Sequence, residues 1–321
     1  IKRRMNEMTM NQLQKKEYAK MKRETANDEW FQKLESAIQG DKIPWRKHWK
    51  GGKSSMPSNL VSKKSYRGGN VIMLWVEAMT NGWTDLRFAT RKQLMDKKMS
   101  IKGLKNGTGV SIKWFSSTKY TKKNDKGEEE EHYGRTLRYY EVFCVEQCED
   151  YVAPVVENAE EIVPVSDIMV HMDEYVASQS TLGYTRVGDK ACYMPLEDKI
   201  VLPPHESFTD TMGEVMTAIH EAVHSTGYAT RLNRNLKSTF GSPEYAYEEL
   251  IAELGSLIVT LTLGGEFKPD LVAEENANNV AYLQSWVKAC KDKDKALNKA
   301  FGDAQKAADY ILSAILGGEE E

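Results

Sequence analysis

The stretch Met216-Thr217-Ala218-Ile219-His220-Glu221-Ala222-Val223-His224-Ser225-Thr226-Gly227 decides how the C-terminal half of the chain is interpreted. Its apolar residues recur at helical spacing, which predicts a helix over Phe208–Thr226. His220 and His224 are four residues apart on one helical face, where both imidazoles can reach one metal ion. Glu221 lies between them and is suited to hold a water molecule and take its proton. The spacing therefore predicts a metal site in which Glu221 is the catalytic base.

A third metal ligand must come from another part of the chain, because a catalytic zinc ion takes three protein ligands and leaves one position for water. No histidine follows His224. The predicted helix Tyr245–Leu263 carries Glu249 and Glu253 on one face, ahead of a nearly continuous apolar run that predicts burial. We assign Glu249 as the ligand and Glu253 as the partner that orients a ligating imidazole, and the reverse assignment stays open. Glu248 points about 100° away from Glu249 and is the weaker candidate.

The predicted metal is zinc, with Mn or Co as alternatives. Such a site is typical of a zinc metallopeptidase of the HExxH, gluzincin-like kind, whose metal polarises the scissile carbonyl. Glu221 would take a proton from the attacking water and deliver one to the leaving amine. The sequence does not choose among four candidates for stabilising the oxyanion: His205, Tyr245, Tyr247 and Arg231.

The length and composition of the chain indicate a protein of two domains. The chain has 321 residues, of which 40% are hydrophobic and 28% charged, as in soluble globular proteins. No apolar run reaches the ~18 residues of a membrane span, and the N-terminus lacks the apolar segment of a signal peptide. The four cysteines have spacings that suit neither a disulfide framework nor a zinc finger. We therefore predict buried, reduced thiols at Cys144 and Cys148, which are four apart in a strand-like run, in a cytoplasmic protein that has no membrane partner.

Charge is divided unevenly along the chain. Residues 1–150 hold 31 Lys and Arg against 19 Asp and Glu, a net charge of +12, and the remainder holds 13 against 28, a net charge of −15. Six of the seven tryptophans lie within residues 30–114, in the basic half. Interleaved aromatic and cationic side chains favour stacking on unpaired bases over readout of a duplex. The first half is thus predicted to bind a polyanion and the second half to have another task.

The densest interleaving is the loop 43–53, in which Trp45 and Trp49 stand among Arg46 and Lys47. A surface that stacks bases and contacts phosphates is one interpretation, and a tryptophan-anchored loop folded on its own core is the other. The turn Tyr66-Arg67-Gly68-Gly69-Asn70 follows, and Asn70 is predicted to cap a helix over Val71–Ala78. Another short helix is predicted after Thr90-Arg91-Lys92-Gln93.

The remaining elements are predicted from periodicity and from turn residues. Strands are expected at Val110–Phe115 and Leu137–Val145, with Lys119–His132 as the polar tip of a hairpin. Residues 149–166 mix Pro, Val and acidic residues, a composition typical of a linker. Beyond the linker we expect a helix Asp167–Ser178, strands Tyr184–Cys192 and Lys199–Leu202, and two amphipathic helices within Asn276–Leu316.

Taken together, these motifs resemble the ArdC-type antirestriction proteins of plasmids and mobile elements, over about residues 28–316. In the C-terminal half the resemblance rests on Ile200-x-Leu202-Pro203 with Phe208, His220-Glu221-x-x-His224-x-Thr226-Gly227, Arg231-Leu232-x-Arg234 and Tyr245-Ala246-x-Glu248-Glu249-Leu250-x-Ala252-Glu253. In the N-terminal half it rests on Ile43-Pro44-Trp45 with Trp49, Pro57-x-Asn59, Tyr66-Arg67-Gly68-x-Asn70, Thr90-x-x-Gln93 and Val142-Phe143. The Lys-rich N-terminal arm, Gly69 and Cys144 depart from the family pattern.

The resemblance implies an α+β fold of two domains, an N-terminal α+β domain that binds single-stranded DNA and a C-terminal zincin-like metallopeptidase domain, mostly helical with a small sheet. We divide the chain into a basic arm 1–27, the single-stranded-DNA-binding domain 28–148, a linker 149–166 and the zincin-like domain 167–321. The family also implies protection of incoming DNA from host restriction, and the protein substrate of the peptidase is unknown. The predicted DNA-binding residues are Trp45, Arg46, Lys47, Trp49, Asn59, Tyr66, Arg67, Asn70, Arg91, Lys92 and Gln93.

Two other functions stay open at this point. The chain can be a coat that shields DNA, with a metal domain that is structural and not proteolytic. It can also be an ordinary cytosolic peptidase without a nucleic-acid role, if the positive charge of the first half has no partner.

Overall fold

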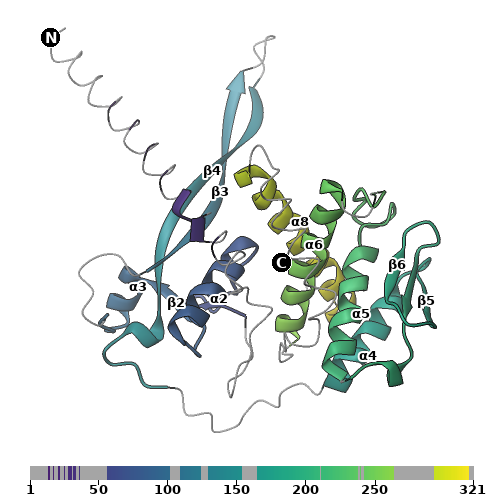
Figure 1. The fold of residues 1–321 in the computed structure, drawn as a ribbon. Coiled ribbons are helices and arrows are strands. Elements are labelled where there is room, and N and C mark those ends of the chain that lie inside the picture. The colour runs from purple at the N-terminus through teal and green to yellow at the C-terminus, as the bar shows by residue number, and fades with distance from the viewer. Residues whose placement is uncertain are drawn as a thin grey trace, which may run out of the picture. The chain divides into compact units, whose positions relative to one another are not determined.

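The computed structural model describes residues 56–101, 109–123, 129–153, 165–209, 211–237, 239, 242–263 and 293–317, and isolated positions between 14 and 36. The loop 43–53, with Trp45, Arg46, Lys47 and Trp49, and residues 276–292 of the predicted helix pair lie outside the described residues. The described residues form both helices and β-sheets, so the predicted α+β class is confirmed (Figure 1).

The chain forms two compact units, which are described separately. One unit contains residues Ile1–Ser36 and Phe88–Tyr151, and the other contains Ala37–Arg87 and Val152–Glu321. The border at Tyr151 falls inside the predicted linker 149–166, but residues 37–87 group with the C-terminal part of the chain. The predicted division into domains stays a prediction.

The first unit is built on a long antiparallel ribbon (Figure 1). Strand β3 (Val110–Lys123) pairs with β4 (Glu129–Cys144) along its whole length. Strand β2 (Arg87–Thr90) adds to the other edge of β4, also antiparallel. Buried apolar residues at the base of the ribbon form the core of this unit: Phe88, Val110, Ile112, Val142 and Phe143. The ribbon confirms both predicted strands of the first half.

The ribbon is longer than the sequence predicts. The assignment of Lys119–His132 to a polar tip is wrong at both ends, because residues 119–123 and 129–132 are paired strand residues. Lys119 forms an ion pair with Glu131 at 2.5 Å, and the ring of Tyr120 stacks on His132 with 5.6 Å between centroids. Such cross-strand pairs stabilise a ribbon whose lysines and glutamates have little strand propensity of their own.

A short helix joins β2 to the rest of this unit. Helix α3 (Arg91–Asp96) begins after Thr90, whose hydroxyl accepts a hydrogen bond from the backbone N–H of Gln93 at 3.3 Å. The side-chain oxygen of Gln93 accepts one from the backbone N–H of Thr90 at 2.9 Å. This reciprocal cap confirms the predicted helix. A 3-10 turn, η2 (Val145–Gln147), follows β4.

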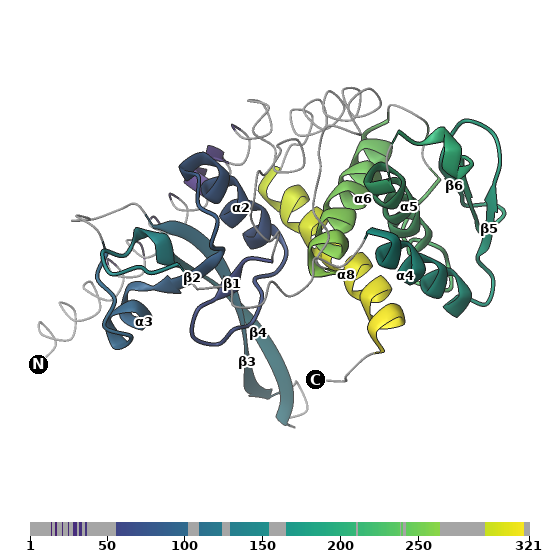
Figure 2. The ribbon, with the colours of Figure 1, turned by 90° about the horizontal axis from the view of Figure 1, so that it is seen from below.

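The second unit combines helices with a small sheet (Figure 2). In the sheet, β7 (Lys199–Leu202) lies between β5 (Gly183–Arg186), which is parallel to it, and β6 (Cys192–Met194), which is antiparallel. Helices α5 (Thr211–Ser225) and α6 (Pro243–Thr262) lie beside α8 (Lys293–Leu316) in both ribbon views. The other described elements of this unit are β1 (Ser58–Asn59), α2 (Gly69–Asn81), α4 (Val165–Ser178) and η3 (His205–Ser207).

Several predicted boundaries in this unit are corrected. The single strand Tyr184–Cys192 is wrong, because the chain turns between β5 and β6 with Gly188 at a φ of 76°. Helix α2 begins at Gly69, so Asn70 lies in its first turn and does not cap it. Helix α4 takes in Val165 and Ser166 of the predicted linker. Helix α5 begins at Thr211 and not at Phe208, because the preceding residues form η3.

The described cysteines differ in their burial. Cys144 and Cys148 are free and fully buried, which confirms the prediction for these two. Cys192, in β6, is free and exposed. Strand β6 is short and lies at the edge of a three-stranded sheet, and its side chains alternate between the core and the surface. Cys290 lies outside the described residues.

Helix α6 is buried along most of its length and approaches α5 closely. A Cβ atom placed on Gly255 would lie 2.9 Å from Cγ1 of Val223, so the two backbones meet where α6 has no side chain. Tyr175 of α4 fixes the other side of α5 through a buried hydrogen bond to Ser225 Oγ at 2.8 Å. Although α6 is mostly apolar, no helix among the described residues is long and apolar enough to span a bilayer.

We expect Gly255→Val to lower the free energy of unfolding by about 1–3 kcal/mol, because its added methyl groups overpack the contact with Val223. The matched control is Gly302→Val in α8, where a Cβ atom meets nothing within 4 Å. Thermal unfolding of both variants measures the difference. Equal melting temperatures for the two variants would contradict the close approach of α5 and α6.

Candidate metal centre

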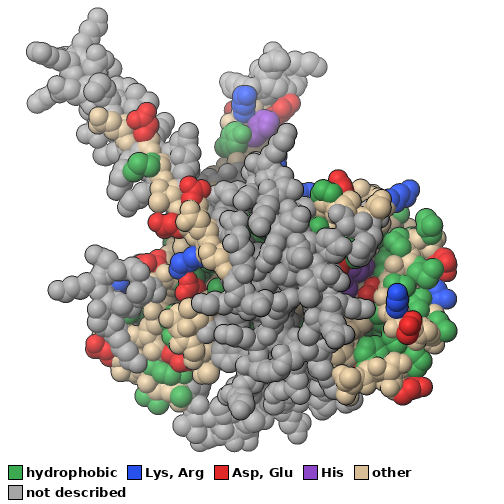
Figure 3. Space-filling model, viewed as in Figure 1, with side chains coloured by type: hydrophobic (Ala, Val, Ile, Leu, Met, Phe, Trp, Pro, Cys, Tyr) green, Lys and Arg blue, Asp and Glu red, His purple; other side chains and the backbone are tan. Residues whose placement is uncertain are grey.

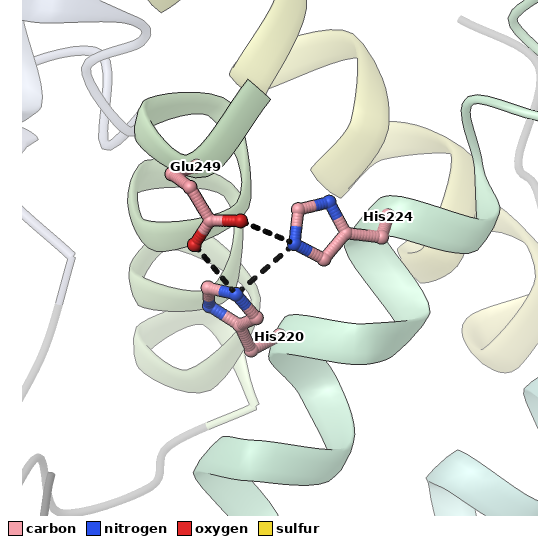
Figure 4. A group of neighbouring side chains, drawn as sticks. All are labelled: His220, His224 and Glu249. Carbon is pink, nitrogen blue, oxygen red and sulfur yellow. Dashed lines mark hydrogen bonds and ion pairs between the residues drawn. The ribbon is translucent and has the colours of Figure 1, made fainter. Parts of the chain in front are cut away.

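Helix α5 directs the side chains of His220 and His224 toward the same point. Its opposite face is buried through Val215, Ile219 and Ala222, which fixes the orientation of the helix. His220 and His224 are one turn apart, and their Nε2 atoms lie 3.1 Å from each other. Figure 4 shows both rings directed toward the same carboxylate. The predicted pairing of the two imidazoles is present in the fold.

Glu249 of α6 completes the group. Its Oε2 lies 3.6 Å from Nε2 of His220, and its Oε1 lies 3.5 Å from Nε2 of His224. One ligand atom from each residue falls within 4.8 Å of the other two. Atoms bound at ~2.1 Å to a tetrahedral zinc ion are ~3.4 Å apart, so this donor set fits such an ion without a change of fold.

The outer nitrogen of each imidazole also faces a carboxylate. Nδ1 of His220 lies 3.8 Å from Oε1 of Glu253, and Nδ1 of His224 lies 3.2 Å from Oε1 of Glu248. Carboxylates in these positions fix the ring orientation and the tautomer of ligating histidines. Glu253 thus lies where the sequence predicted an orienting partner. Glu248, the weaker candidate of the sequence, has the same relation to the other histidine.

Arg234 holds Glu248 in place. Its guanidinium donates to both carboxylate oxygens of Glu248, at 3.0 and 2.7 Å. It also donates to the Thr226 hydroxyl at 2.7 Å and to the Val223 carbonyl at 2.8 Å, at the end of α5. One arginine therefore links the end of α5, the loop beyond it and the start of α6. The sequence analysis missed this link, although the motif Arg231-Leu232-x-Arg234 contained its signal.

The charges of the centre are mutually dependent. Burial opposes ionisation of His224, but hydrogen bonds to Glu248 and Glu249 hold its pKa well above the usual value. Burial likewise opposes ionisation of His220, and Glu249 and Glu253 raise its pKa. The pKa of Glu249 lies well below its usual value, because contacts with both histidines outweigh its burial. The carboxylates thus favour positive charge at the point where a metal cation would sit.

Glu221 lies beside this group and is 8% exposed. Its negative charge contributes to the raised pKa of His224 and, after burial, to the raised pKa of the Cys192 thiol. Glu221 therefore lies near both His224 of α5 and Cys192 of the edge strand β6, which contacts α5. A base in this position can serve a reaction between the metal centre and the strand.

Arg231, Tyr247 and His205, three of the residues that the sequence offers for oxyanion stabilisation, each contact an acidic side chain. Arg231 is 3% exposed in its side chain and pairs with Asp198, and it also donates to the Ser225 carbonyl at 2.7 Å. Tyr247 donates its hydroxyl to Asp303 at 2.9 Å, and Nδ1 of His205 lies 2.5 Å from a carboxylate oxygen of Glu214. Tyr245 is the fourth candidate. Its backbone N–H donates to Ser242 at the start of α6.

The described DNA-binding candidates lie in both units. In the second unit, the Asn59 amide donates to the Tyr66 hydroxyl at 3.3 Å, Arg67 pairs with Asp309 of α8, and Asn70 lies in the first turn of α2. In the first unit, the Arg91 guanidinium lies over the Phe143 ring at 5.3 Å, and Lys92 is exposed. Gln93 caps α3 with its side-chain oxygen.

Comparison with known families matches two consecutive segments of the chain. Residues 23–143 match the N-terminal domain of the anti-restriction factor ArdC. Residues 171–303 match the zincin-like metallopeptidase family MPTase-PolyVal. The predicted linker 149–166 falls between the two matched segments.

Individual relatives are similar over most of this chain. The crystal structure of the antirestriction protein ArdC from plasmid R388 in its metal-free form has a TM-score of 0.66 and 28% identity, and the match covers 92% of this chain and 98% of that one. The Mn(II)-bound form of the same protein has a TM-score of 0.66 and 27% identity, over 91% and 99% of the two chains. The Sinorhizobium fredii protein y4eC is 27% identical over 87% of each chain.

Two proteins named DNA primase TraC, from Escherichia coli, are 32% and 29% identical over 88% of this chain. The chain spans only 19% and 26% of their length. The similarity therefore concerns one part of each TraC protein.

We expect Glu249→Gln to lower zinc affinity more than Glu253→Gln does. Loss of an orienting carboxylate costs about 10–100-fold in affinity, and loss of a ligand should cost more. Competition with a chromogenic chelator measures both variants, with Glu244→Gln, exposed in the first turn of α6, as the control. If Glu253→Gln has the larger effect, the two roles must be exchanged.

Proposed function

Because the chain belongs to the ArdC-type antirestriction family, we propose that it binds single-stranded DNA and carries a zinc-dependent metallopeptidase. Both activities would serve the protection of mobile-element DNA from restriction. The peptidase half rests on one observation, the convergence of His220, His224 and Glu249 within ligand distance. The Mn(II)-bound form of R388 ArdC supports a divalent ion at such a site.

In this proposal His220, His224 and Glu249 hold the ion, and Glu253 orients His220. A bound zinc ion supplies Lewis acidity toward a carbonyl and lowers the pKa of water toward about 7. Glu221 accepts a proton from the attacking water and returns it to the leaving amine. Strand β6, an edge strand of the sheet among the described residues, is suited to hold an extended substrate backbone by strand addition. We propose a protein substrate on this basis.

The DNA-binding half is proposed from the match to the ArdC N-terminal domain and from the net charge of +12 in residues 1–150. The TraC relatives are named as DNA primases, which favours a nucleic-acid partner. The proposed contacts are the predicted set from Trp45 to Gln93. Arg91 and Lys92 are the described members at the start of α3, both exposed. The proposed location is the cytoplasm, where incoming DNA meets restriction enzymes.

A second function is favoured by the charge of the centre itself. Three glutamates of α6, at 248, 249 and 253, face the two histidines of α5. A cation would stabilise this contact, because it adds positive charge where several carboxylates lie close together in a largely buried region. The metal would then maintain the fold of a DNA-shielding protein and perform no proteolysis.

The two functions are separated by Glu221→Gln. If the chain is a peptidase, this variant should lose about 100-fold or more in cleavage of an unfolded test protein, because it removes the general base. Its affinity for zinc and for DNA should stay near that of the wild type. Survival of an incoming plasmid in a restricting host measures the cellular effect.

The control for that experiment is Glu197→Gln, an exposed substitution in the turn between β6 and β7. Full protection by Glu221→Gln would exclude peptidase chemistry as the cause of antirestriction. It would leave the shielding function in its place.

For DNA binding we expect the affinity for a labelled single strand to fall linearly with the logarithm of salt concentration. The slope should be about −0.7 for each phosphate contacted. Lys92→Ala should make the slope less steep by about 0.7, whereas Lys190→Ala, exposed between β5 and β6, should not change it. Anisotropy titrations at several salt concentrations measure both, and a flat salt dependence of the wild type would reject DNA binding.

A further inference from the structure

Exposed aromatic side chains follow both faces of the β3–β4 ribbon. Residues paired across an antiparallel ribbon share a face, and successive residues alternate between faces. Trp114 opposite Arg138 and Tyr120 opposite His132 therefore lie on one face, together with Tyr140. We name these five residues the aromatic track. Its three large aromatic residues are 56%, 50% and 40% exposed, in the order Trp114, Tyr120 and Tyr140.

The track has no acidic side chain between its two ends. The face positions between the Trp114 and Tyr120 rungs are occupied by small residues: Ser116, Thr118, Gly134 and Thr136. At one end Arg138 is exposed and forms no ion pair with any residue that the structure describes. The track thus combines open rings with an available cation.

Gly134 and His132 position the ring of Tyr120. A Cβ atom on Gly134 would lie 3.3 Å from Cε1 of Tyr120, so the ring covers the strand where no side chain stands. The Tyr120 ring also stacks on the ring of His132, with an angle of 23° between the two ring planes. An aromatic ring that is held in this way loses little side-chain entropy when a planar ligand stacks on it.

The opposite face of the ribbon differs in its charges. It carries Phe115 and Tyr133, which are 58% and 66% exposed. Two lysines of this face whose side chains are described have partners there: Lys113 lies 3.8 Å from the Trp30 ring, and Lys119 pairs with Glu131. Among the described side chains, a phosphate would therefore meet the exposed Arg138 on the track face, whereas Lys113 and Lys119 on the other face are held by a ring and by a carboxylate. In Figure 3 the far end of the ribbon presents hydrophobic, basic, acidic and histidine side chains together.

We propose that the aromatic track binds single-stranded nucleic acid, with bases stacked on Trp114 and Tyr120 and a phosphate near Arg138. This inference rests on the proposed single-stranded-DNA binding and assigns it a surface that the sequence analysis did not predict. Six residues of strand separate the two rings, about 20 Å, which corresponds to about six nucleotides at the rise of a stacked strand.

Unpaired bases fit the track better than a duplex or a protein. Stacking on isolated rings needs exposed base faces, which a duplex covers with its own neighbours. The rings are separated by polar positions, so they do not form the continuous apolar patch of a protein interface. The dominant interactions, stacking and a phosphate contact, tolerate any base sequence.

The test is an anisotropy titration of the full chain with fluorescein-labelled oligothymidylate of about 12 nucleotides, twice the length of the track. We expect Trp114→Ala with Tyr120→Ala to weaken binding by about 30-fold or more, at about fivefold or more for each stacked base. The matched control is Phe115→Ala with Tyr133→Ala, two equally exposed rings on the opposite face, which should change affinity less than about twofold. Circular dichroism and thermal unfolding confirm that both variants fold.

Arg138→Ala should reduce the salt slope by about 0.7, and Arg138→Lys should restore it. The track is rejected if the two double variants lose equal affinity, or if neither loses any while the wild type binds. It is also rejected if a duplex of the same length binds as well as the single strand, or if the track variant changes the oligomeric state. If the wild type binds no single strand at all, the proposed function fails, and the track fails with it.

Discussion

The close contact between α5 and α6 is the constraint on which the second unit depends. One helix supplies both imidazoles, so the third ligand must come from a neighbour whose backbone approaches within reach of a glutamate side chain. Gly255 permits that approach, because any side chain there would meet Val223. Leu254, Leu257 and the apolar residues around them bury the rest of α6 and keep it there.

The same contact brings carboxylates into a region from which water is largely excluded. An unpaired buried charge costs several kcal/mol, so each carboxylate needs a partner. Glu248 has Arg234 and His224, and Glu249 has both histidines. Arg234 is therefore as necessary to the geometry as the ligands, because it neutralises Glu248 and ties the loop after α5 to α6. Arg231 has the corresponding role toward Asp198 and links the end of α5 to the small sheet.

The sequence predicts what depends on spacing along one helix and misses what depends on how two elements meet. The four-residue interval placed His220 and His224 on one face, and the apolar run placed α6 in the core. The 100° argument against Glu248 assumed a single point of contact. In the fold, His224 is one turn beyond His220, and its outer nitrogen meets Glu248 while that of His220 meets Glu253. The outer part of the ribbon, residues 119–123 and 129–132, was missed for a similar reason, since its lysines and glutamates stabilise strands only through their cross-strand partners.

The compact units of the fold do not coincide with the two segments that match known families. The turn at Gly68 shows the reason. This turn belongs to the segment matched by the ArdC N-terminal domain, yet the Gly68 N–H donates to Gln305 of α8 at 2.8 Å. The nearby pair of Arg67 and Asp309 is exposed and contributes little to stability, so the backbone hydrogen bond and the adjoining α2 are the stronger link. Helix α2 is apolar on nearly every side, so it must be packed against other elements around its whole circumference. A boundary drawn at the linker alone would separate α2 from α8, which supplies part of that cover. The turn that carries predicted DNA contacts is thus built into the unit that carries the metal centre.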